Sequence, residues 1–588
     1  MDAPFDRGGS PRLSHYAHSV QLFSARRSVL SAFAASLVAS VATASVLAES
    51  NDTRRVRLPF PAYDGTLTPY TFGLGYPLVT LVYDTLLWRD ANGVPRPWLA
   101  RSVTRSDNGL RLTVRLRSGV RWHDGRPLTA ADVAFTFGYV AAHYQPRFTP
   151  QLADVRQVRA TGRLTATIDL RRPSLGFDDQ PLADLPILPR HRWQGLPGGQ
   201  LAPGGLPLGS GPYRLVSARP QHGYVLRANR GYFRGAPKVR EIRVPIIGDA
   251  DRTYRGLRDR NVDMVPLSLP EPTATDVGST LGIALRRGPS YTGTALVLNV
   301  RRAPFDRPAA RRAVAGALDL ERIARSVAPA LAADEGFIHP ASRWSAGEPL
   351  QRFDPLASRP VLARLGKTPV RVLAPDNDPV RLEAGRQVVL ALRQAGARAT
   401  LVKLARARVN QATGADGSPA DFDAAIQSTP ALASHDPDYL SRLFGSDARA
   451  APLNVGGYRS GAFDAVARRV ASASDVVARK RATTAELELL ARDVPSIPLF
   501  FSQGTFAYRS AVYDGWMFVK GNGILDKRSF LAGARSAVGE SRPPEATAEP
   551  EDSESRFGLV DLISLAALAI VAGLAATALL LRRRAGRR

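Results

Sequence analysis

Residues 97–140 have the sequence PWLARSVTRSDNGLRLTVRLRSGVRWHDGRPLTAADVAFTFGYV, and this stretch decides the fold of the chain. Within it, residues 110–116 alternate Leu-Arg-Leu-Thr-Val-Arg-Leu, a period of two that predicts a half-buried strand. The turn dipeptides Asn108-Gly109 and Asp124-Gly125 flank this strand, and glycine adopts positive φ there without a steric cost. The pattern therefore predicts one strand bounded by two tight turns.

A helix start follows the second turn. Thr129 and Asp132 have the spacing of a capping box, in which the threonine hydroxyl accepts a backbone N–H and the carboxylate reaches back to the cap residue. Val133 and Phe137 follow at roughly helical spacing. By themselves, these signals indicate a strand, a turn and a helix in an α/β protein.

The order of residues in this stretch is more specific than its secondary structure. It resembles the signature of extracytoplasmic substrate-binding proteins of ABC importers, in the large peptide/nickel-binding class called solute-binding protein family 5. Other stretches match the family in the same chain order, and the resemblance covers about residues 55–530. These stretches are residues 208–214, 226–233, 298–299, 304–306, 311–313, 317–319, 436–438, 457–460 and 494–499.

The composition is that of an ordinary globular protein without cysteine. With 588 residues, 44% hydrophobic and 22% charged, the chain is long enough for two or three folding units. The absence of cysteine excludes disulfides, thiol catalysis, cysteine-ligated metal sites and a lipid-modified cysteine anchor. The formal charge of +27 comes from arginines spread along the chain, since only six of the 79 basic residues are lysine. No dense basic block with interleaved aromatics occurs, so we expect no nucleic-acid partner.

The N-terminal segment, residues 1–48, has the features of an export signal. Residues 29–47 carry no charge, follow Arg26-Arg27 and end in small-x-small patterns suited to cleavage. The two arginines are compatible with a twin-arginine signal as well as with general export. An uncleaved anchor helix is the alternative, which the Ala/Ser-rich, weakly hydrophobic composition disfavours.

The C-terminal segment predicts a membrane anchor on a stalk. Residues 559–581 form an apolar run with one charge, Asp561, and are long enough to cross a hydrocarbon core of roughly 30 Å. Residues 582–588 contain five arginines and should remain cytoplasmic. Residues 536–556 are rich in Pro, Ser, Glu and Asp, which is typical of a solvated, disordered linker. We therefore expect a single-pass protein of the cell membrane with its binding domain on the extracytoplasmic side.

Strand and helix signals alternate through the exported part. Residues 369–374 predict a strand, residues from Pro379 to Gly396 a helix, and residues 399–402 a second strand, which together make a βαβ unit with parallel strands. The resemblance implies two α/β lobes of the periplasmic-binding-protein type that close like a hinged clamp. It places lobe I at about residues 52–290 with 500–535 and lobe II at about 291–499. The hinge crossovers would lie near residues 291–298 and 497–502.

No catalytic or metal motif is complete. Gly366-Lys367-Thr368 ends like a phosphate-binding loop, but Val361 occupies the position of the leading glycine. No Gly-x-Ser-x-Gly elbow occurs, and the histidines are scattered singly without metal-ligand spacing. We therefore expect no enzymatic activity, no cofactor and no metal.

The candidate ligand-binding residues are those that the resemblance places at the cleft between the lobes. Aromatic side chains near the start of the chain can supply rigid apolar walls, with ordinary core packing as the alternative. Two more residues flank the expected hinge, and two lie in the Asp-Pro-Asp stretch. The full set is Tyr70, Phe72, Tyr76, Tyr291, Asn299, His435 and Asp436.

One position departs from the family pattern. Peptide-binding members carry an aspartate three residues before the Asp-Pro pair, where it pairs with the free amine of the peptide. This chain has Ala433 there, and a buried ammonium without a partner is costly. Asp436 or Asp438 can substitute for that carboxylate, although both also suit a helix start. Peptide, opine-like, sugar-containing and metal-chelate ligands all remain open.

The resemblance implies a receptor that captures a peptide or peptide-like solute between two lobes, and the C-terminal segment predicts that this receptor is anchored in the membrane. Its partners would be the solute and the permease and ATPase subunits of an ABC transporter. A sensory or scaffolding ectodomain that keeps the fold without transport is the alternative, and neighbouring permease and ATPase genes would separate the two.

Overall fold

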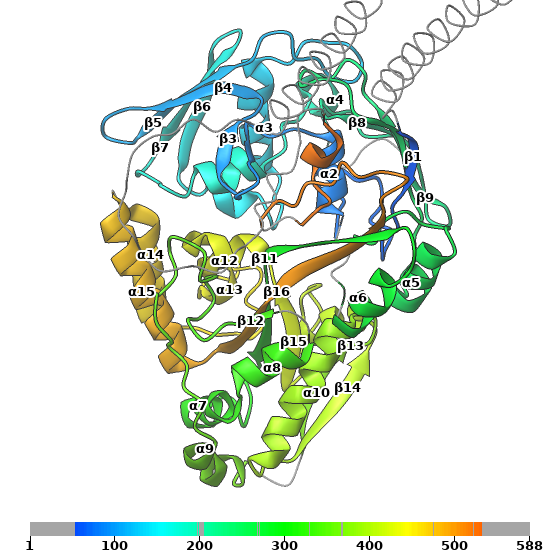
Figure 1. Cartoon of the computed structure of the whole chain (residues 1–588). Helices are drawn as coiled ribbons and strands as arrows, with labels where there is room; N and C mark the ends of the chain where they lie inside the picture. Colours follow the sequence, from blue (N-terminus) through cyan, green and yellow to red (C-terminus); the bar gives the residue numbers. More distant parts are fainter. Residues whose placement is uncertain are drawn as a thin grey trace, which may run out of the picture. The chain divides into compact units, whose positions relative to one another are not determined.

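The computed structural model describes residues 53–531, apart from residues 74, 197, 199–204, 267–268, 270, 328–329, 366–368, 474 and 521–522. These residues form two lobes, each with its own hydrophobic core (Figure 1). The export signal, the acidic linker, the apolar run 559–581 and the basic tail lie outside the described residues. Within the described part, no helix has both the length and the apolar character needed to span a bilayer.

Lobe I contains two four-stranded sheets and a hairpin. One sheet has the order β1-β10-β9-β8, with β1 parallel to β10 and the other pairs antiparallel. The other sheet is antiparallel, in the order β4-β5-β7-β6. The strands are β1 (Thr53–Arg57), β2 (Leu87–Arg89), β3 (Pro95–Pro97), β4 (Ala100–Arg105), β5 (Arg111–Leu116), β6 (Val155–Gly162), β7 (Thr165–Leu170), β8 (Tyr213–Arg219), β9 (Gly223–Ala228) and β10 (Val239–Val244).

The stretch that decides the fold adopts the predicted structure. β5 alternates buried Leu112, Val114 and Leu116 with more exposed residues, as the period of two requires. Gly109 and Gly125 have φ of +68° and +88°, so both predicted turns use the left-handed region that glycine tolerates. The helix α3 (Ala130–Ala142) begins with the predicted capping box. The strand, turn and helix predictions are therefore confirmed.

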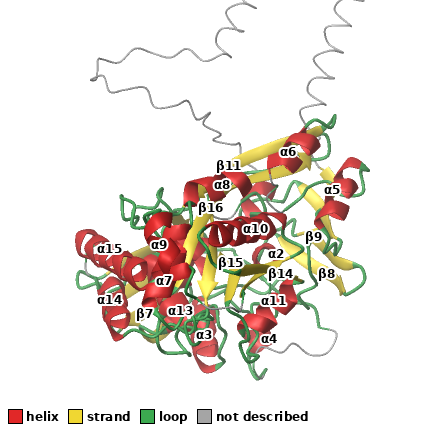
Figure 2. Ribbon diagram, turned by 90° about the horizontal axis from the view of Figure 1, so that it is seen from below, coloured by secondary structure: helices red, strands yellow, loops and turns green. Residues whose placement is uncertain are grey.

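Lobe II is built on one mixed six-stranded sheet in the order β12-β16-β11-β15-β13-β14. Its strands are β11 (Ile283–Leu298), β12 (Ala330–Ala332), β13 (Val370–Pro375), β14 (Ala399–Leu404), β15 (Ala424–Thr429) and β16 (Ser496–Arg509). The predicted βαβ unit is confirmed, because β13 and β14 are parallel and α10 (Pro379–Gln394) connects them. Figure 2 shows α10 lying across this sheet, where its buried Val388 and Leu392 join the core of the lobe.

The remaining helices cover the sheets and line the space between the lobes. Those of lobe I are α2 (Tyr76–Val82), α4 (Arg190–Trp193), α5 (Ala250–Arg258) and α6 (Glu271–Gly278), with the short turns η1 (Thr149–Leu152), η2 (Asp178–Leu182) and η4 (Lys527–Phe530). Those of lobe II are α7 (Pro308–Ala317), α8 (Leu320–Val327), α9 (Pro355–Leu362), α11 (Arg406–Thr413), α12 (Ala431–His435), α13 (Leu440–Phe444), α14 (Gly461–Ser472) and α15 (Val476–Asp493), with η3 (Pro437–Tyr439).

Two long strands run from one lobe into the other. β11 and β16 are antiparallel partners and lie side by side between the two halves of Figure 1, in green and orange. Near one end of the pair, Phe506 and Tyr508 belong to the core of lobe I, whereas Leu296 and Ile497 near the other end belong to the core of lobe II. The register shifts between Pro289 and Gly293, so the ladder is irregular where the strands pass between the lobes.

Candidate functional site

A cavity lies between the two lobes. One part has a volume of about 340 Å³ and a second part of about 410 Å³, and the two adjoin each other, since Tyr76, Pro77, Trp88 and Thr292 line both. We call the combined space the interlobe cavity. Its walls come from both lobes and from the crossing strands β11 and β16. A solute bound there would contact both lobes at once.

An aromatic wall faces the cavity from β11. The Tyr291 ring stacks on the His435 ring, with centroids 5.3 Å apart and an interplanar angle of 19°. The His339 ring contacts the other side of Tyr291 edge-on at 4.8 Å. Burial lowers the pKa of His339 to about 4, so this ring is neutral at physiological pH. The Tyr291 and His435 rings therefore present a rigid aromatic surface to the cavity, of the kind that binds the body of a ligand.

A second wall is built around Tyr76, the first residue of α2. The Arg147 guanidinium lies 3.9 Å from the centroid of the Tyr76 ring and donates two hydrogen bonds, of 2.7 and 3.0 Å, to the Asp184 carboxylate. The Tyr76 hydroxyl donates to the backbone carbonyl of Asp184. Burial alone would raise the pKa of Asp184, but the attraction of Arg147 outweighs it and holds that pKa below its usual value. This pair is internally neutral and fixes the tyrosine in place.

The structure brings three of the seven candidate residues to the interlobe cavity, namely Tyr76, Tyr291 and His435. Tyr70 and Phe72 instead pack in lobe I, where the Tyr70 hydroxyl donates to the His143 carbonyl at 3.0 Å. Core packing is the alternative interpretation for the three aromatic residues Tyr70, Phe72 and Tyr76. It describes the surroundings of Tyr70 and Phe72.

Asn299 and Asp436 also do not line the interlobe cavity. Asn299 is buried just beyond the end of β11, where its Nδ2 donates to the Phe422 carbonyl at 2.9 Å and holds two parts of lobe II together. Asp436 is buried and accepts a hydrogen bond of 2.6 Å from Arg479 and one of 2.8 Å from Gln180. Because Gln180 lies on η2 of lobe I, Asp436 takes part in the contact between lobes rather than in the cavity wall.

The lobe contact around Asp436 brings several acidic side chains close together. Glu486 is fully buried, and neither of its carboxylate oxygens has a hydrogen-bond partner among the described residues. Asp438 lies 3.1 Å from Arg479, and burial raises its pKa to about 7. Burial also raises the pKa of Glu486 well above its usual value. The Arg479 guanidinium therefore faces three carboxyl groups, those of Asp436, Asp438 and Glu486, with Arg442 and Arg172 lining the same contact.

Gly176 of lobe I closes over this cluster. A Cβ on Gly176 would lie 2.4 Å from Asp438 Oδ2 and 3.1 Å from Asp436 Oδ2, so only glycine permits this approach of the two lobes. Together with Asp438 and Glu486, Gly176 lines a separate cavity of about 350 Å³ between the lobes. The carboxyl cluster therefore lies at the wall of this cavity, where the two lobes meet.

Several cavity residues had no sequence signal. Trp88, Arg89, Arg147, Arg406 and Lys520 all line the interlobe cavity, although they come from four separate parts of the chain. None of them lies in a recognisable motif. Only the assembly of the two lobes brings them to one space.

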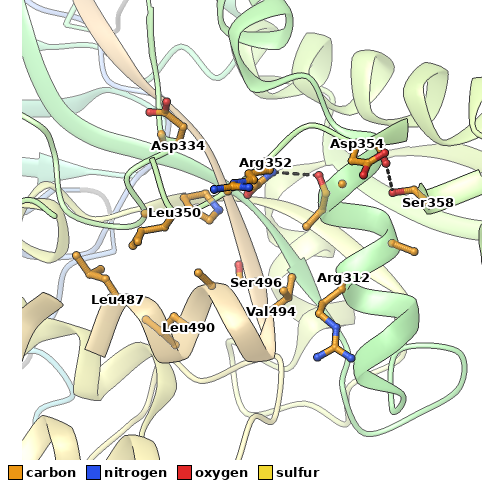
Figure 3. A pocket seen from close by; sticks show the side chains of 18 of the residues that line it. Arg312, Asp334, Leu350, Arg352, Asp354, Ser358, Leu487, Leu490, Val494 and Ser496 are labelled. Carbon is orange, nitrogen blue, oxygen red and sulfur yellow. Dashed lines mark hydrogen bonds between the residues drawn. The ribbon is translucent and has the colours of Figure 1, made fainter. Parts of the chain in front are cut away.

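Another cavity lies within lobe II. It has a volume of about 430 Å³ and is lined within lobe II by residues of α7, α9 and α15 and of the loop near Leu350 (Figure 3). Leu487 and Leu490 form one apolar side, and Arg312 and Asp354 lie on the other. Because all of its walls belong to lobe II, this cavity is not the space between the lobes.

No metal centre is evident in the part of the chain that the structure describes, since it contains no group of three or more His, Cys, Asp or Glu side chains arranged to hold an ion.

Comparison with known proteins connects this geometry to one family. Residues 94–451 match the model of the bacterial extracellular solute-binding proteins, family 5 Middle. The oligopeptide-binding protein AppA of Bacillus subtilis is 26% identical over 234 residues, which cover 39% of this chain and 43% of AppA. The chain thus spans less than half the length of this curated relative. The family consists of solute-binding proteins rather than enzymes.

Solved structures of such proteins share the fold. The ABC transporter substrate-binding protein CtaP of Listeria monocytogenes has a TM-score of 0.71 at 21% identity, covering 82% of this chain and 99% of that one. The structure of AppA from Bacillus subtilis in complex with a nonapeptide has a TM-score of 0.70 at 20% identity, covering 81% of this chain and 99% of that one. The two-lobed architecture is therefore that of these substrate-binding proteins.

Proposed function

Because the chain belongs to family 5 of the bacterial extracellular solute-binding proteins, we propose that it is the substrate-binding receptor of an ABC importer. The interlobe cavity carries this proposal, since its walls come from both lobes and from the two strands that join them. A ligand that contacts both lobes stabilises the closed form relative to an open one. The irregular segment of β11 between Pro289 and Gly293 is the hinge on this proposal.

The proposed ligand is a peptide or peptide-like solute. The name of the AppA relative and its complex with a nonapeptide support this class. Ala433 leaves the position of the amine-pairing carboxylate without a charge, so unmodified peptides with a free amine should bind weakly. The aromatic wall around Tyr291 supports a ligand whose body stacks or packs against rings.

We further propose that the receptor is tethered to the cell membrane and works outside the cytoplasm. The support is in the sequence, from the export-signal features of residues 29–47 and the apolar run 559–581 with its basic tail. The closed, loaded form would dock on the permease, and the ATPase would drive import.

The direct test is to purify the full-length chain and identify the solutes it retains by mass spectrometry. Each solute found is then added back to the emptied protein, and the compaction of the two lobes is followed by small-angle X-ray scattering. We expect at least one retained small solute that produces compaction. If no solute is retained and none changes the scattering, the sensory or scaffolding alternative replaces the receptor function.

A matched pair of variants localises the binding. His435→Ala removes one face of the ring stack and should weaken binding of the retained solute by roughly threefold to tenfold, the range of an aromatic contact. Asn299→Ala removes a buried side chain that does not line the cavity, so it should affect stability and leave affinity unchanged. Equal affinity losses in both variants would contradict the cavity assignment.

A further inference from the structure

The charge on the walls of the interlobe cavity is unbalanced. Five cationic side chains line the cavity, but only three carboxylates do so. The cations are Arg89, Arg147, Arg381, Arg406 and Lys520, and the carboxylates are those of Asp184, Asp378 and Asp526. An excess of positive charge in a partly closed, low-dielectric space attracts anions.

Three of the five cations already have partners. Arg147 forms its two hydrogen bonds with Asp184, and Arg381 forms an ion pair of 2.7 Å with Asp378. Arg89 is buried and donates to the backbone carbonyls of Asp179 and Ala183. These side chains are therefore held by the protein and shape the cavity.

Arg406 has no such partner. It is the first residue of α11 in lobe II, and among the described residues it forms neither an ion pair within 4 Å nor a side-chain hydrogen bond. Asp378 and Asp64 lie within electrostatic reach, but Asp378 is paired with Arg381 and Asp64 accepts the backbone N–H of Gly75. Burial lowers the pKa of Arg406 to about 10, so the side chain is charged at physiological pH yet poorly compensated.

Lys520 is the second cation without a partner. It belongs to the segment that packs in the core of lobe I and lies beside the ring stack, close enough to His339 to disfavour protonation of that histidine. Within the described ranges its ammonium forms no ion pair and donates no hydrogen bond. Lys520 and Arg406 thus line adjoining parts of the interlobe cavity from opposite lobes.

We infer that the interlobe cavity takes an organic solute with at least two anionic groups and no cationic one, held by Arg406 from lobe II and by Lys520 from lobe I. This inference rests on the proposed function. Each anionic group would gain a charge-assisted hydrogen bond, and the body of the solute would pack on the aromatic wall between them. Because the two cations belong to different lobes, a solute that engages both also links the lobes in the closed form.

The test uses the full-length chain and four probes of one backbone. They are N-acetyl-Ala-Phe-Glu with two carboxylates, N-acetyl-Ala-Phe-Gln with one, N-acetyl-Ala-Phe-Gln amide with none, and the free-amine Ala-Phe-Gln amide with a positive charge. Calorimetry should show affinity rising by about tenfold with each added carboxylate, the effect of one hydrogen bond to a charged group. The free-amine probe should bind least.

Four variants, one of them a control, test which residues cause the dependence of affinity on carboxylates. Arg406→Gln and Lys520→Gln should each reduce the affinity of the two-carboxylate probe by about tenfold and leave the neutral probe unaffected. Lys403→Gln is the matched control, since Lys403 is exposed on β14 and does not line the cavity. Lys520→Arg keeps the charge and should restore most of the binding. Thermal unfolding of each variant checks that the fold is intact.

The inference is overturned if the neutral or free-amine probe binds as tightly as the two-carboxylate probe, or if the two-carboxylate probe does not bind at millimolar concentration. It is also overturned if Arg406→Gln and Lys520→Gln bind that probe like the control. None of these outcomes bears on the proposed receptor function. That function is contradicted only if no retained solute compacts the two lobes.

Discussion

At the scale of single residues, Asp132 shows how one side chain serves two elements. Its carboxylate accepts the backbone N–H of Thr129 at 2.8 Å, as the capping box predicts, and also the N–H of Arg190 at 3.0 Å. The first bond starts α3, and the second connects α3 to the first turn of α4. The sequence pattern predicts only the first of these, because Arg190 lies 58 residues further along the chain.

Because Asp132 accepts two backbone N–H groups, its substitution should lower stability more than substitution of the cap residue Thr129. Thr129→Ala should lower the free energy of unfolding by about 1 kcal/mol. Asp132→Ala should cost more, roughly 1–3 kcal/mol for each backbone donor left without an acceptor. Urea unfolding of the full-length variants measures both values. Neither substitution should change solute affinity, and a stable variant with abolished binding would show that this segment is a ligand site.

At the scale of elements, one buried ion pair ties the end of the described chain to its beginning. Lys527 on η4 donates to Asp84 at 2.8 Å, and both side chains are fully buried. Asp84, which follows α2, also accepts hydrogen bonds from Tyr232, Trp98 and Ser210. The network fixes the segment that carries Lys520 and so positions one wall of the interlobe cavity.

Removing one partner from this pair should be strongly destabilising. Asp84→Ala leaves a buried ammonium without compensation, which typically costs about 3–5 kcal/mol. The double variant Asp84→Asn with Lys527→Met removes both charges and should recover part of the loss. Chemical denaturation of Asp84→Ala and of the double variant measures their free energies of unfolding. If Asp84→Ala lowers the free energy of unfolding by less than about 1 kcal/mol, the network around Asp84 does not hold these segments together.

At the scale of the whole molecule, the carboxyl cluster at the lobe contact makes closure depend on pH. In the closed form burial raises the pKa of Asp438 to about 7, whereas an aspartate exposed to water releases its proton near pH 4. Besides Glu486, the groups that face Asp438 are Arg479, Asp436, Arg172 and Asp154. Between these pH values the closed form binds more protons than an open one.

Closure and solute affinity should therefore be strongest near pH 4 and weaken as the pH rises to about 7, by at most tenfold per unit for each proton. Asp438→Asn removes the titrating group and should flatten this profile. Asp447→Asn, an exposed residue that lines the same cavity, is the control and should keep the wild-type slope. Calorimetry from pH 4.5 to 7.5 measures the affinity of each protein for the retained solute and so tests this dependence. A flat wild-type profile would contradict the prediction.

The topology of the full chain is a separate prediction at this scale. An epitope placed in residues 540–555 should be accessible to protease on intact cells if residues 29–47 act as the proposed export signal and residues 559–588 as the proposed stop-transfer anchor. An epitope after residue 588 should be protected and serves as the control. Complete protection of the linker epitope would contradict extracytoplasmic placement.

The sequence by itself determined the local elements and the family of this protein. The β5 strand, the capping box of α3 and the βαβ unit follow from periodicity and turn chemistry, which act between residues close in the chain. The motif order adds the two-lobed fold by resemblance. Of the candidate site, Tyr76, Tyr291 and His435 could be placed in this way, because they lie near the cleft and the hinge that the resemblance implies.

Only the tertiary structure decided what the cavity walls contain. Asp436 suits a helix start in sequence, and whether it faces a ligand or Arg479 depends on how α15 and η2 pack around it. The sequence does not distinguish Arg406 and Lys520 from the other basic residues, of which the chain has 79 in all. They stand out only in the structure, where both line the interlobe cavity and neither has an acidic partner among the described residues. Pairing and burial are properties of the assembled lobes, since charges far apart in the chain interact only after folding brings them close.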